Sequence, residues 1–405
     1  MFFWSIISLV AAIYRTGENS FMVYQKPIRH ASRSHQIIDA LLTFIRKNVV
    51  LNVAIVLAVV TSCIVLPDAQ YAEYFDWKTL TCLFCTLAVV CALKNIKFFT
   101  ILARKIVDCT GNLRMAVIAL VYITFLGSML ISNDMALLTF LPLGFFVLTS
   151  TGKQKHMAFV FIMQNIAANL GGMLTPFGNP QNLYLYSKFN IPTGEFMQIM
   201  LLPFLASIAL ITICCLFLPR DKLSITEVCP YKLPAKRTAI YLVLFALSII
   251  VVFRIIPYWI GLIVIPLALL FLDKKALRQV DYSLLATFFC FFIFAGNMAR
   301  IPAVNDLLST LLEKNTLLFS ILSCQVISNV PSAILLSQFT LDYPALLIGV
   351  NIGGTGTLIA SLASLITFRE YTAHNPGKAS SYLGKFTAYN VGFVVVLTAL
   401  SYLVL

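Results

Sequence analysis

Two stretches of the chain follow the same pattern: residues 169–182 read NLGGMLTPFGNPQN, and residues 351–357 read NIGGTGT. Each holds two adjacent glycines and a threonine three residues further on, inside a long apolar run. The first also carries two prolines and two asparagines between Thr175 and Asn182. Glycine and proline interrupt a helix and free backbone groups, which a membrane tolerates only where they line a cavity. Both stretches therefore predict a broken helix beside a polar cavity.

The rest of the sequence is that of a membrane protein. Hydrophobic residues make up 60% of the 405 residues, and charged residues make up only 11%. An apolar run of about 20 residues spans a bilayer as a helix, and the chain holds roughly ten such runs, some of them short. The alternating pattern of an outer-membrane barrel is missing, so the spanning elements are predicted to be helices. The predicted fold class is an all-α polytopic membrane protein.

The placement of positive charge predicts an orientation. The net charge is +13, but Lys and Arg gather in alternate loops, which argues for a membrane topology and against nucleic acid as a partner. By the positive-inside rule, these loops are expected on the cytoplasmic side of the cell inner (plasma) membrane. The basic loops are residues 15–48, 94–114, 151–156, 219–238, 273–279 and 368–385.

Two apolar stretches differ from the others because a polar tip interrupts them. Residues 115–150 contain Ser132-Asn133-Asp134, and residues 316–340 contain Ser328-Asn329. If each stretch is a re-entrant hairpin that enters and leaves on one side, all the basic loops fall on one side of the membrane. We therefore predict two re-entrant hairpins. The remaining apolar runs are residues 2–14, 49–66, 79–93, 197–218, 239–256, 258–272, 282–298 and 386–405, with an interfacial helix expected at 37–45 and amphipathic stretches at 94–114 and 301–314.

The two halves of the chain match each other in order. Phe75-Asp76-Trp77 corresponds to Val280-Asp281-Tyr282, and Ile131-Ser132-Asn133 corresponds to Ile327-Ser328-Asn329. On the predicted topology, Asp76 faces outside and Asp281 faces inside, so the repeats are inverted. Inverted repeats of about five transmembrane helices, each with a hairpin and a broken helix, are typical of transporters that bind near the midplane. The predicted units are a first repeat at 1–218 with its broken helix at 157–187, a linker at 219–238, and a second repeat at 239–405 with its broken helix at 344–367.

The hairpin tips and the broken helices carry the chemistry of the predicted site. Backbone carbonyls with Ser, Thr and Asn oxygens suit a hard monovalent cation, and free amide groups at helix starts suit an anion. The alternative, that these small polar residues only allow close helix packing, is less favoured when four motifs form an inverted pattern. The expected cation-binding residues are Ser132, Asn133, Asp134, Asn169, Gly171, Gly172, Ser328, Asn329, Asn351, Gly353, Gly354 and Gly356. The expected substrate-binding residues are Asn133, Thr175, Pro176, Asn179, Asn329, Thr355 and Thr357.

Asp134 is the only acidic residue that we place inside the membrane. Acids at such positions are costly and usually mark an ion or proton path, so Asp134 is expected to bind or sense a coupling cation. The alternative is a cap at the hairpin tip that is exposed to water. The counterpart of Asp134 in the second half is Val330, so the two half-sites are predicted to differ. All four histidines lie in predicted cytoplasmic loops, which argues against a histidine proton relay.

At these residues the chain resembles the ion transporter superfamily, which includes divalent anion/sodium symporters, citrate transporters, arsenite permeases and some sodium/proton antiporters. The resemblance rests on Ser132-Asn133, Ser328-Asn329, the two Gly-Gly-x-x-Thr stretches and Thr175-Pro176. It implies that two hairpins and two broken helices form sodium and substrate sites in an elevator-type transporter that is a homodimer. Dicarboxylate symporters of this family carry Ser-Asn-Thr at both tips, whereas this chain has Asp134 and Val330 at the third position.

The sequence therefore favours a secondary active transporter that moves a small anion, either a carboxylate or an oxyanion, coupled to Na+ or H+. The alternative is a Na+/H+ antiporter or an arsenite-type efflux permease that uses Asp134. An enzyme is not expected, because the spans lack paired acids, a catalytic base or metal ligands. No cofactor is expected, and Na+ is the only metal ion for which we predict a site.

Overall fold

We describe the fold from a computed structural model, which describes residues 48–108, 110–222, 233–403 and 405. The chain divides into two units, Met1–Val49 and Val50–Leu405. The helix packing described below is that within the second unit. The expected apolar run at 2–14 and the expected interfacial helix at 37–45 lie outside the described residues.

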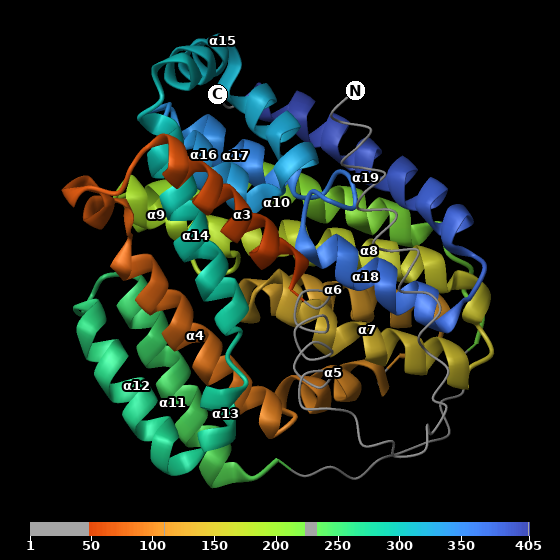
Figure 1. Ribbon diagram of the computed structural model, residues 1–405. Helices are drawn as coiled ribbons and strands as arrows, with labels where there is room; N and C mark the ends of the chain where they lie inside the picture. The colour runs from red at the N-terminus through yellow and green to blue at the C-terminus, as the bar shows by residue number, and fades with distance from the viewer. Residues whose placement is uncertain (1–47, 109, 223–232, 404) are drawn as a thin grey trace, which may run out of the picture. The chain divides into compact units, whose positions relative to one another are not determined.

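The described residues form helices joined by short connections (Figure 1), as the sequence predicts. Nine of these helices are long and apolar enough to cross a membrane, judged by length and composition among the described residues. The α-helices are α3 (Val49–Ile64), α4 (Trp77–Asn95), α5 (Phe98–Asp108), α6 (Leu113–Ile131), α7 (Asn133–Ser150), α8 (Met157–Gly171), α9 (Pro180–Lys188), α10 (Thr193–Leu216), α11 (Ala235–Val252), α12 (Tyr258–Leu272), α13 (Lys274–Arg278), α14 (Tyr282–Ala299), α15 (Pro302–Ile327), α16 (Asn329–Leu336), α17 (Tyr343–Gly353), α18 (Leu362–His374) and α19 (Ala379–Ser401). Short 3-10 helices cover Ala69–Tyr74 (η2), Gln154–His156 (η3) and Gly172–Leu174 (η4).

Several helices begin where a side chain caps the first turn. The Asp76 carboxylate accepts a hydrogen bond from the Thr79 N–H at 2.9 Å, and that of Asp281 accepts one from the Leu284 N–H at 2.9 Å. Such caps satisfy backbone donors that the first turn leaves without partners. The last helix begins at Ala379 rather than at the predicted residue 386, since its polar first turns are also helical.

Two pairs of helices meet at a serine with an unusual backbone. α6 and α7 join at Ser132 (φ 70°, ψ 156°), and α15 and α16 join at Ser328 (φ 76°, ψ 161°). A positive φ is strained for a residue other than glycine and is found where the surrounding structure holds it. α6 and α7 are 19 and 18 residues long, and both count among the nine candidate spans of the described residues. α15 has a non-helical residue, Asn315, which divides an amphipathic first part from the arm that leads to Ser328.

Two helices are interrupted at the glycine motifs. α8 ends at Gly171, a short 3-10 turn follows, and α9 starts at Pro180, where a missing N–H costs nothing. α17 ends at Gly353, and α18 starts after Ser361, which caps it by accepting from the Ser364 N–H. Between these helices the chain is irregular, and most of its residues are buried.

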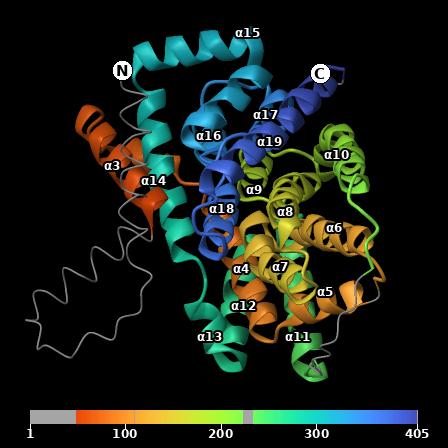
Figure 2. The ribbon, with the colours of Figure 1, turned by 90° about the vertical axis from the view of Figure 1, so that its right-hand side faces the viewer.

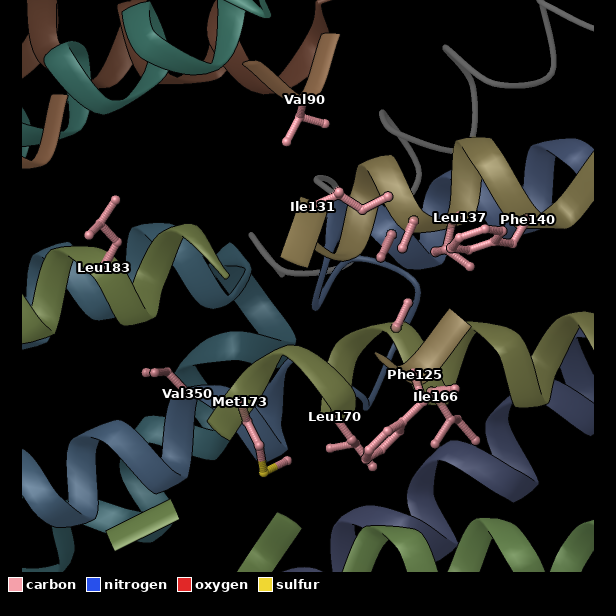
Figure 3. Close-up of a cluster of buried hydrophobic side chains, with 14 of the residues drawn as sticks. Val90, Phe125, Ile131, Leu137, Phe140, Ile166, Leu170, Met173, Leu183 and Val350 are labelled. Carbon is pink, nitrogen blue, oxygen red and sulfur yellow. The ribbon is translucent and has the colours of Figure 1, made fainter. Parts of the chain in front are cut away.

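Two groups of helices in the second unit can be distinguished by their packing, and α3, α5, α10, α14 and α19 are assigned to neither. In the α4 group, α11, α12 and α13 pack beside α4, as both views show (Figures 1 and 2). In the broken-helix group, α6 and α7 pack on α8, α15 and α16 pack on α17, α9 packs on α16 and α17, and α18 packs on α7 and α8. Figure 3 shows apolar side chains of this second group, including Phe125, Ile166 and Leu170, buried next to one another near the first break.

The close approach of α6 to α8 depends on Gly171. A Cβ atom at this position would lie 2.2 Å from the Phe125 carbonyl oxygen and 2.6 Å from Ser128 Oγ. The nearest atom belongs to a helix backbone, which cannot turn aside as a flexible side chain can.

We therefore expect Gly171→Ala to lower the free energy of unfolding by about 1–3 kcal/mol, the usual cost of overpacking a core. Thermal unfolding of the purified protein in detergent would measure this as a lower melting temperature. Gly392→Ala on α19 is the control, because an added Cβ there meets nothing within 4 Å. Equal melting temperatures for the two variants would contradict the packing argument.

Candidate functional site

The two broken helices contact each other through a network of buried side-chain amides. Asn351 of α17 donates from Nδ2 to Asn182 Oδ1 at 2.6 Å, although the two residues are far apart in the sequence. Its Oδ1 accepts from Asn179 Nδ2 at 3.3 Å and from Gln181 Nε2 at 3.5 Å. All four side chains are at most 1% exposed. Asn351, which lies just before the second break, is therefore hydrogen-bonded to residues at the start of α9, just after the first break.

A second set of contacts joins the other two parts of the broken helices. Asn165 of α8 donates from Nδ2 to Ser364 Oγ at 3.4 Å, and its Oδ1 accepts from Thr367 Oγ1 at 3.4 Å. Ser364 and Thr367 lie on α18, beyond the second break. Each broken helix thus contacts the other on both sides of its break.

The tip of the α6–α7 hairpin lies against the first break. Asn133 donates from Nδ2 to Asn169 Oδ1 at 3.2 Å, and its Oδ1 accepts from the Asp134 N–H at 3.0 Å. Thr175 Oγ1 donates to the Met129 carbonyl of α6 at 3.0 Å. Four of the predicted site residues, Asn133, Asn169, Thr175 and Asn179, are therefore brought together, because Asn179 Nδ2 also donates to the Asn169 carbonyl at 3.2 Å.

The backbone carbonyls of the first break converge on one side chain. Asn182 Nδ2 lies 3.1 Å from the Gly172 oxygen, 3.2 Å from the Met173 oxygen and 3.4 Å from the Thr175 oxygen. Gly172 leaves room for Asn179, since a Cβ on Gly172 would lie 2.4 Å from Asn179 Oδ1. Pro176 is buried in the same segment.

The tip of the α15–α16 hairpin lies against the second break in a related way. The Asn329 N–H and Ser328 Oγ both donate to the Ala360 carbonyl, at 2.9 Å and 3.2 Å. Asn329 also lies close to Gly354, whose added Cβ would be 2.8 Å from Asn329 Nδ2. Thr357 Oγ1 donates to the Gln325 carbonyl at 3.4 Å, but Thr357 is exposed whereas Thr175 is buried.

Three residues at this site, Asn165, Asn182 and Gln325, are not among the predicted binding residues, although Asn182 ends the stretch predicted to lie beside a polar cavity. Gln325 donates from Nε2 to the Gly353 carbonyl at 2.8 Å and accepts at Oε1 from the Thr357 N–H at 2.7 Å, which closes the second break. A Cβ on Gly356 would lie 2.0 Å from Gln325 Oε1. The signal that could have found Asn165 and Gln325 is an amide side chain within an otherwise apolar run.

Asp134 lies in the first turn of α7 and is partly buried. Its Oδ1 is buried, and no group in the described part of the chain makes a hydrogen bond with that atom. The hydrogen bonds of the structure connect Asp134 to the amide network through its backbone N–H and not through its carboxylate. Within the same described residues, Asn179 Oδ1, Gln181 Oε1 and Thr355 Oγ1 are also buried without a hydrogen-bond partner.

One cavity borders the site, and a larger one lies away from it. A cavity of about 20 Å³, large enough for a water molecule, separates α4 from the first hairpin tip and is lined by Leu83, Thr86, Leu87, Val90, Ile131, Ser132, Phe177, Pro180, Leu183 and Leu284. A larger one of about 320 Å³ lies beside η2, α14 and the ends of α9 and α16, and carries charged groups of both signs, among them Lys188, Glu73 and Arg300. Arg300 is paired with Asp68 at 2.6 Å, and this ion pair holds the pKa of the Asp68 carboxyl below its usual range.

Comparison with known proteins gives a consistent result. Residues 37–343 match the family model described as "Citrate transporter". An uncharacterized transporter of Methanocaldococcus jannaschii is 33% identical over 295 residues, which cover 73% of this chain and 81% of that protein. The inner membrane protein YbiR of Escherichia coli is 30% identical over 307 residues, covering 73% and 80% of the two chains. The resemblance drawn from the hairpin and glycine motifs is thereby confirmed, and the chain belongs to the citrate transporter family, within the ion transporter superfamily, as a multi-pass membrane transporter.

Proposed function

We propose that this transporter moves a small anion, a carboxylate or an oxyanion, across the membrane in a step coupled to Na+ or H+. The observation that carries the proposal is the buried junction of two broken helices with two hairpin tips. Four helices, α7, α9, α16 and α18, begin at this junction. Helix starts offer free N–H groups and a positive dipole end, which suit an anion in a site with few charged side chains.

We propose that the two halves are inverted repeats, each with a re-entrant hairpin and a broken helix. Three repeated local features support this. Asp76 and Asp281 cap matched helices, Ser132 and Ser328 share one unusual backbone conformation, and a threonine after each break donates to a carbonyl three residues before the tip serine. Inverted repeats place equivalent half-sites face to face, which suits binding near the midplane and alternating access.

Asp134 is the proposed site of cation coupling. A buried carboxylate oxygen without a hydrogen-bond partner, as Asp134 Oδ1 is among the described residues, is costly unless it binds a cation or a proton. Ser132 and Asn133 directly precede Asp134 in the chain, and Asn133 contacts Asn169. These side chains and the carbonyls around Gly171 and Gly172 supply oxygen atoms of the kind that Na+ prefers. Val330 in the equivalent place cannot take this role.

We propose an elevator-type movement of the broken-helix group past the α4 group. A contact that would have to break lies at the end of α9. Arg254, between α11 and α12, donates to Asn190 Oδ1 at 2.7 Å and to the Tyr186 carbonyl, and its guanidinium lies 3.9 Å from the centre of the Tyr186 ring. A homodimer in the inner membrane with cytoplasmic basic loops is part of the same proposal, and the name of the Escherichia coli relative supports that location.

The second candidate function is Na+/H+ exchange without an organic substrate, or efflux of the arsenite type. Asp134 is the specific observation that favours it, because a fixed carboxylate next to a bound anion is unfavourable unless a cation neutralises it.

Asp134→Asn tests the proposed role of this carboxylate in cation coupling. In proteoliposomes with independently set Na+ and pH gradients, we expect the wild type to take up citrate, succinate, phosphate or arsenite in response to one gradient. In the variant, the rate of gradient-driven uptake should fall by about tenfold or more, because the substitution removes the proposed cation ligand. Asp306→Asn, which removes an exposed acid from the amphipathic part of α15, is the control. Sodium efflux that is driven by pH alone and needs no anion would favour the second candidate.

Asn351→Ala tests whether the two breaks act as one unit. The substitution leaves Asn182 Oδ1 without its partner, which should lower the free energy of unfolding by about 1–3 kcal/mol and abolish uptake. Ser248→Ala is the control, since this buried hydroxyl bonds only within its own helix, to the Phe245 carbonyl. Melting temperature and uptake would both be measured. Full uptake by a folded Asn351→Ala variant would show that the amide network is dispensable.

A further inference from the structure

We infer that the Gln325 side chain takes the place of a cation at the second break, so that each protomer binds a single coupling cation, at the first break. This inference rests on the proposed function, and it narrows the two predicted cation sites to one. It starts from Gln325, a residue that the sequence motifs did not include.

Gln325 has a counterpart in the first half of the chain. Gln325 lies three residues before its tip serine, and Met129 lies three residues before the other. The backbone carbonyls of both residues accept a hydrogen bond from the threonine that follows the break, Thr175 Oγ1 at 3.0 Å and Thr357 Oγ1 at 3.4 Å. The two positions therefore share this backbone contact, which allows their side chains to be compared.

The two side chains differ in the hydrogen bonds that they can make. Gln325 Nε2 donates to the Gly353 carbonyl at 2.8 Å and to the Ile321 carbonyl at 3.0 Å, and Oε1 accepts from the Thr357 N–H at 2.7 Å. The amide thus satisfies a carbonyl at the end of α17 and a donor beyond the break at the same time. Methionine has no N–H to donate, and among the described residues no side chain donates to the carbonyl of Gly171, the counterpart of Gly353.

The Gln325 amide also fills the space at the second break. A Cβ on Gly356 would lie 2.0 Å from Gln325 Oε1, so the glycine-rich break encloses the amide closely. A cation bound to the Gly353 carbonyl would have to displace an N–H group that is covalently attached and already at hydrogen-bond distance. The first break also holds an amide, that of Asn182, but this amide meets the carbonyls of Gly172, Met173 and Thr175 and not that of Gly171. In the described part of the chain, the buried oxygens without a hydrogen-bond partner include Asp134 Oδ1, Asn179 Oδ1 and Gln181 Oε1 on the side of the first break and Thr355 Oγ1 at the second, and only Asp134 offers a carboxylate.

Another pair of equivalent positions also differs in a way that favours a cation at the first break. Four residues before the tip serine, the first half has Ser128 and the second has Cys324. Each side chain lies against the last glycine before its break, where an added Cβ would be 2.6 Å from Ser128 Oγ and 2.9 Å from Cys324 Sγ. A hydroxyl oxygen is a hard ligand that suits Na+, whereas a neutral thiol is a poor one. With Asp134 against Val330, three paired positions favour a cation at the first break and disfavour it at the second.

The test is the number of radioactive sodium ions bound per protomer by the purified full chain in detergent, with choline replacing Na+ as the blank. We expect one bound ion in the wild type and none in Asp134→Asn. Gln325→Glu replaces the N–H donor by a carboxylate oxygen and should add one bound ion, while Gln338→Glu, at a partly exposed position beyond the end of α16, should add none. If Gln325→Glu does not fold, Gln325→Ser is used, and its melting temperature should rise with NaCl more than that of the wild type, because a ligand of the native state stabilises it.

Two ions in the wild type, or one retained in Asp134→Asn, would overturn the inference and leave cation-coupled transport standing. If the wild type binds no sodium ion, the coupling ion at the first break is a proton. The inference then depends on the Gln325 variants alone: a sodium ion gained by Gln325→Glu, or a larger rise of melting temperature with NaCl in Gln325→Ser, would support it, and the absence of both would overturn it. The proposed function fails separately, if the stoichiometry is as expected but no cation gradient drives uptake of any of the four anions.

Discussion

A helix that is broken within a membrane leaves backbone N–H and C=O groups that lipid cannot satisfy, and the structure depends on how this chain satisfies them. Each unpaired group in hydrocarbon costs several kcal/mol, at roughly the scale of the net stability of a domain. In this chain, primary amide side chains make hydrogen bonds with these backbone groups. Asn182 meets three carbonyls at the first break, and Gln325 meets a carbonyl and an N–H at the second. An amide suits this task because it donates and accepts without carrying a charge.

The same amides tie the two breaks to each other. Asn351 bonds to residues beyond the first break, and Asn165 bonds to residues beyond the second. Buried polar networks in a medium of low dielectric constant are strong when complete and costly when a member is lost. One break therefore cannot shift far unless the other shifts with it. This is the mechanical property that a site built from two half-sites needs if it is to cross a membrane as one body.

The parts of this fold that could be predicted from the sequence are those with local causes. Pro180 is favoured as the first residue of α9 because of its own backbone, and Asp76 and Asp281 cap helices through contacts with residues three positions away. The apolar runs likewise locate most helices. The pairing of Asn351 with Asn182 and the closure of the second break by Gln325 join residues that are far apart in the chain. No local pattern specifies such pairs, because they follow from how α17 packs on α9 and on α15.

The differences between the half-sites lie in their side chains, while the contacts that repeat involve the backbone. Thr175 and Thr357 donate to backbone carbonyls, and Ser132 and Ser328 share a backbone conformation, so these features place few demands on neighbouring side chains. The positions that differ, such as Asp134 and Val330, do not take part in those contacts through their side chains. A half-site can therefore change its chemistry while its break stays intact, provided that another group satisfies the freed carbonyls. A cation satisfies them only while it is bound, whereas a side-chain amide stays attached to the chain when an ion leaves. A site that must release its ion and a site that only has to hold the helices together are therefore best built from different side chains on the same scaffold.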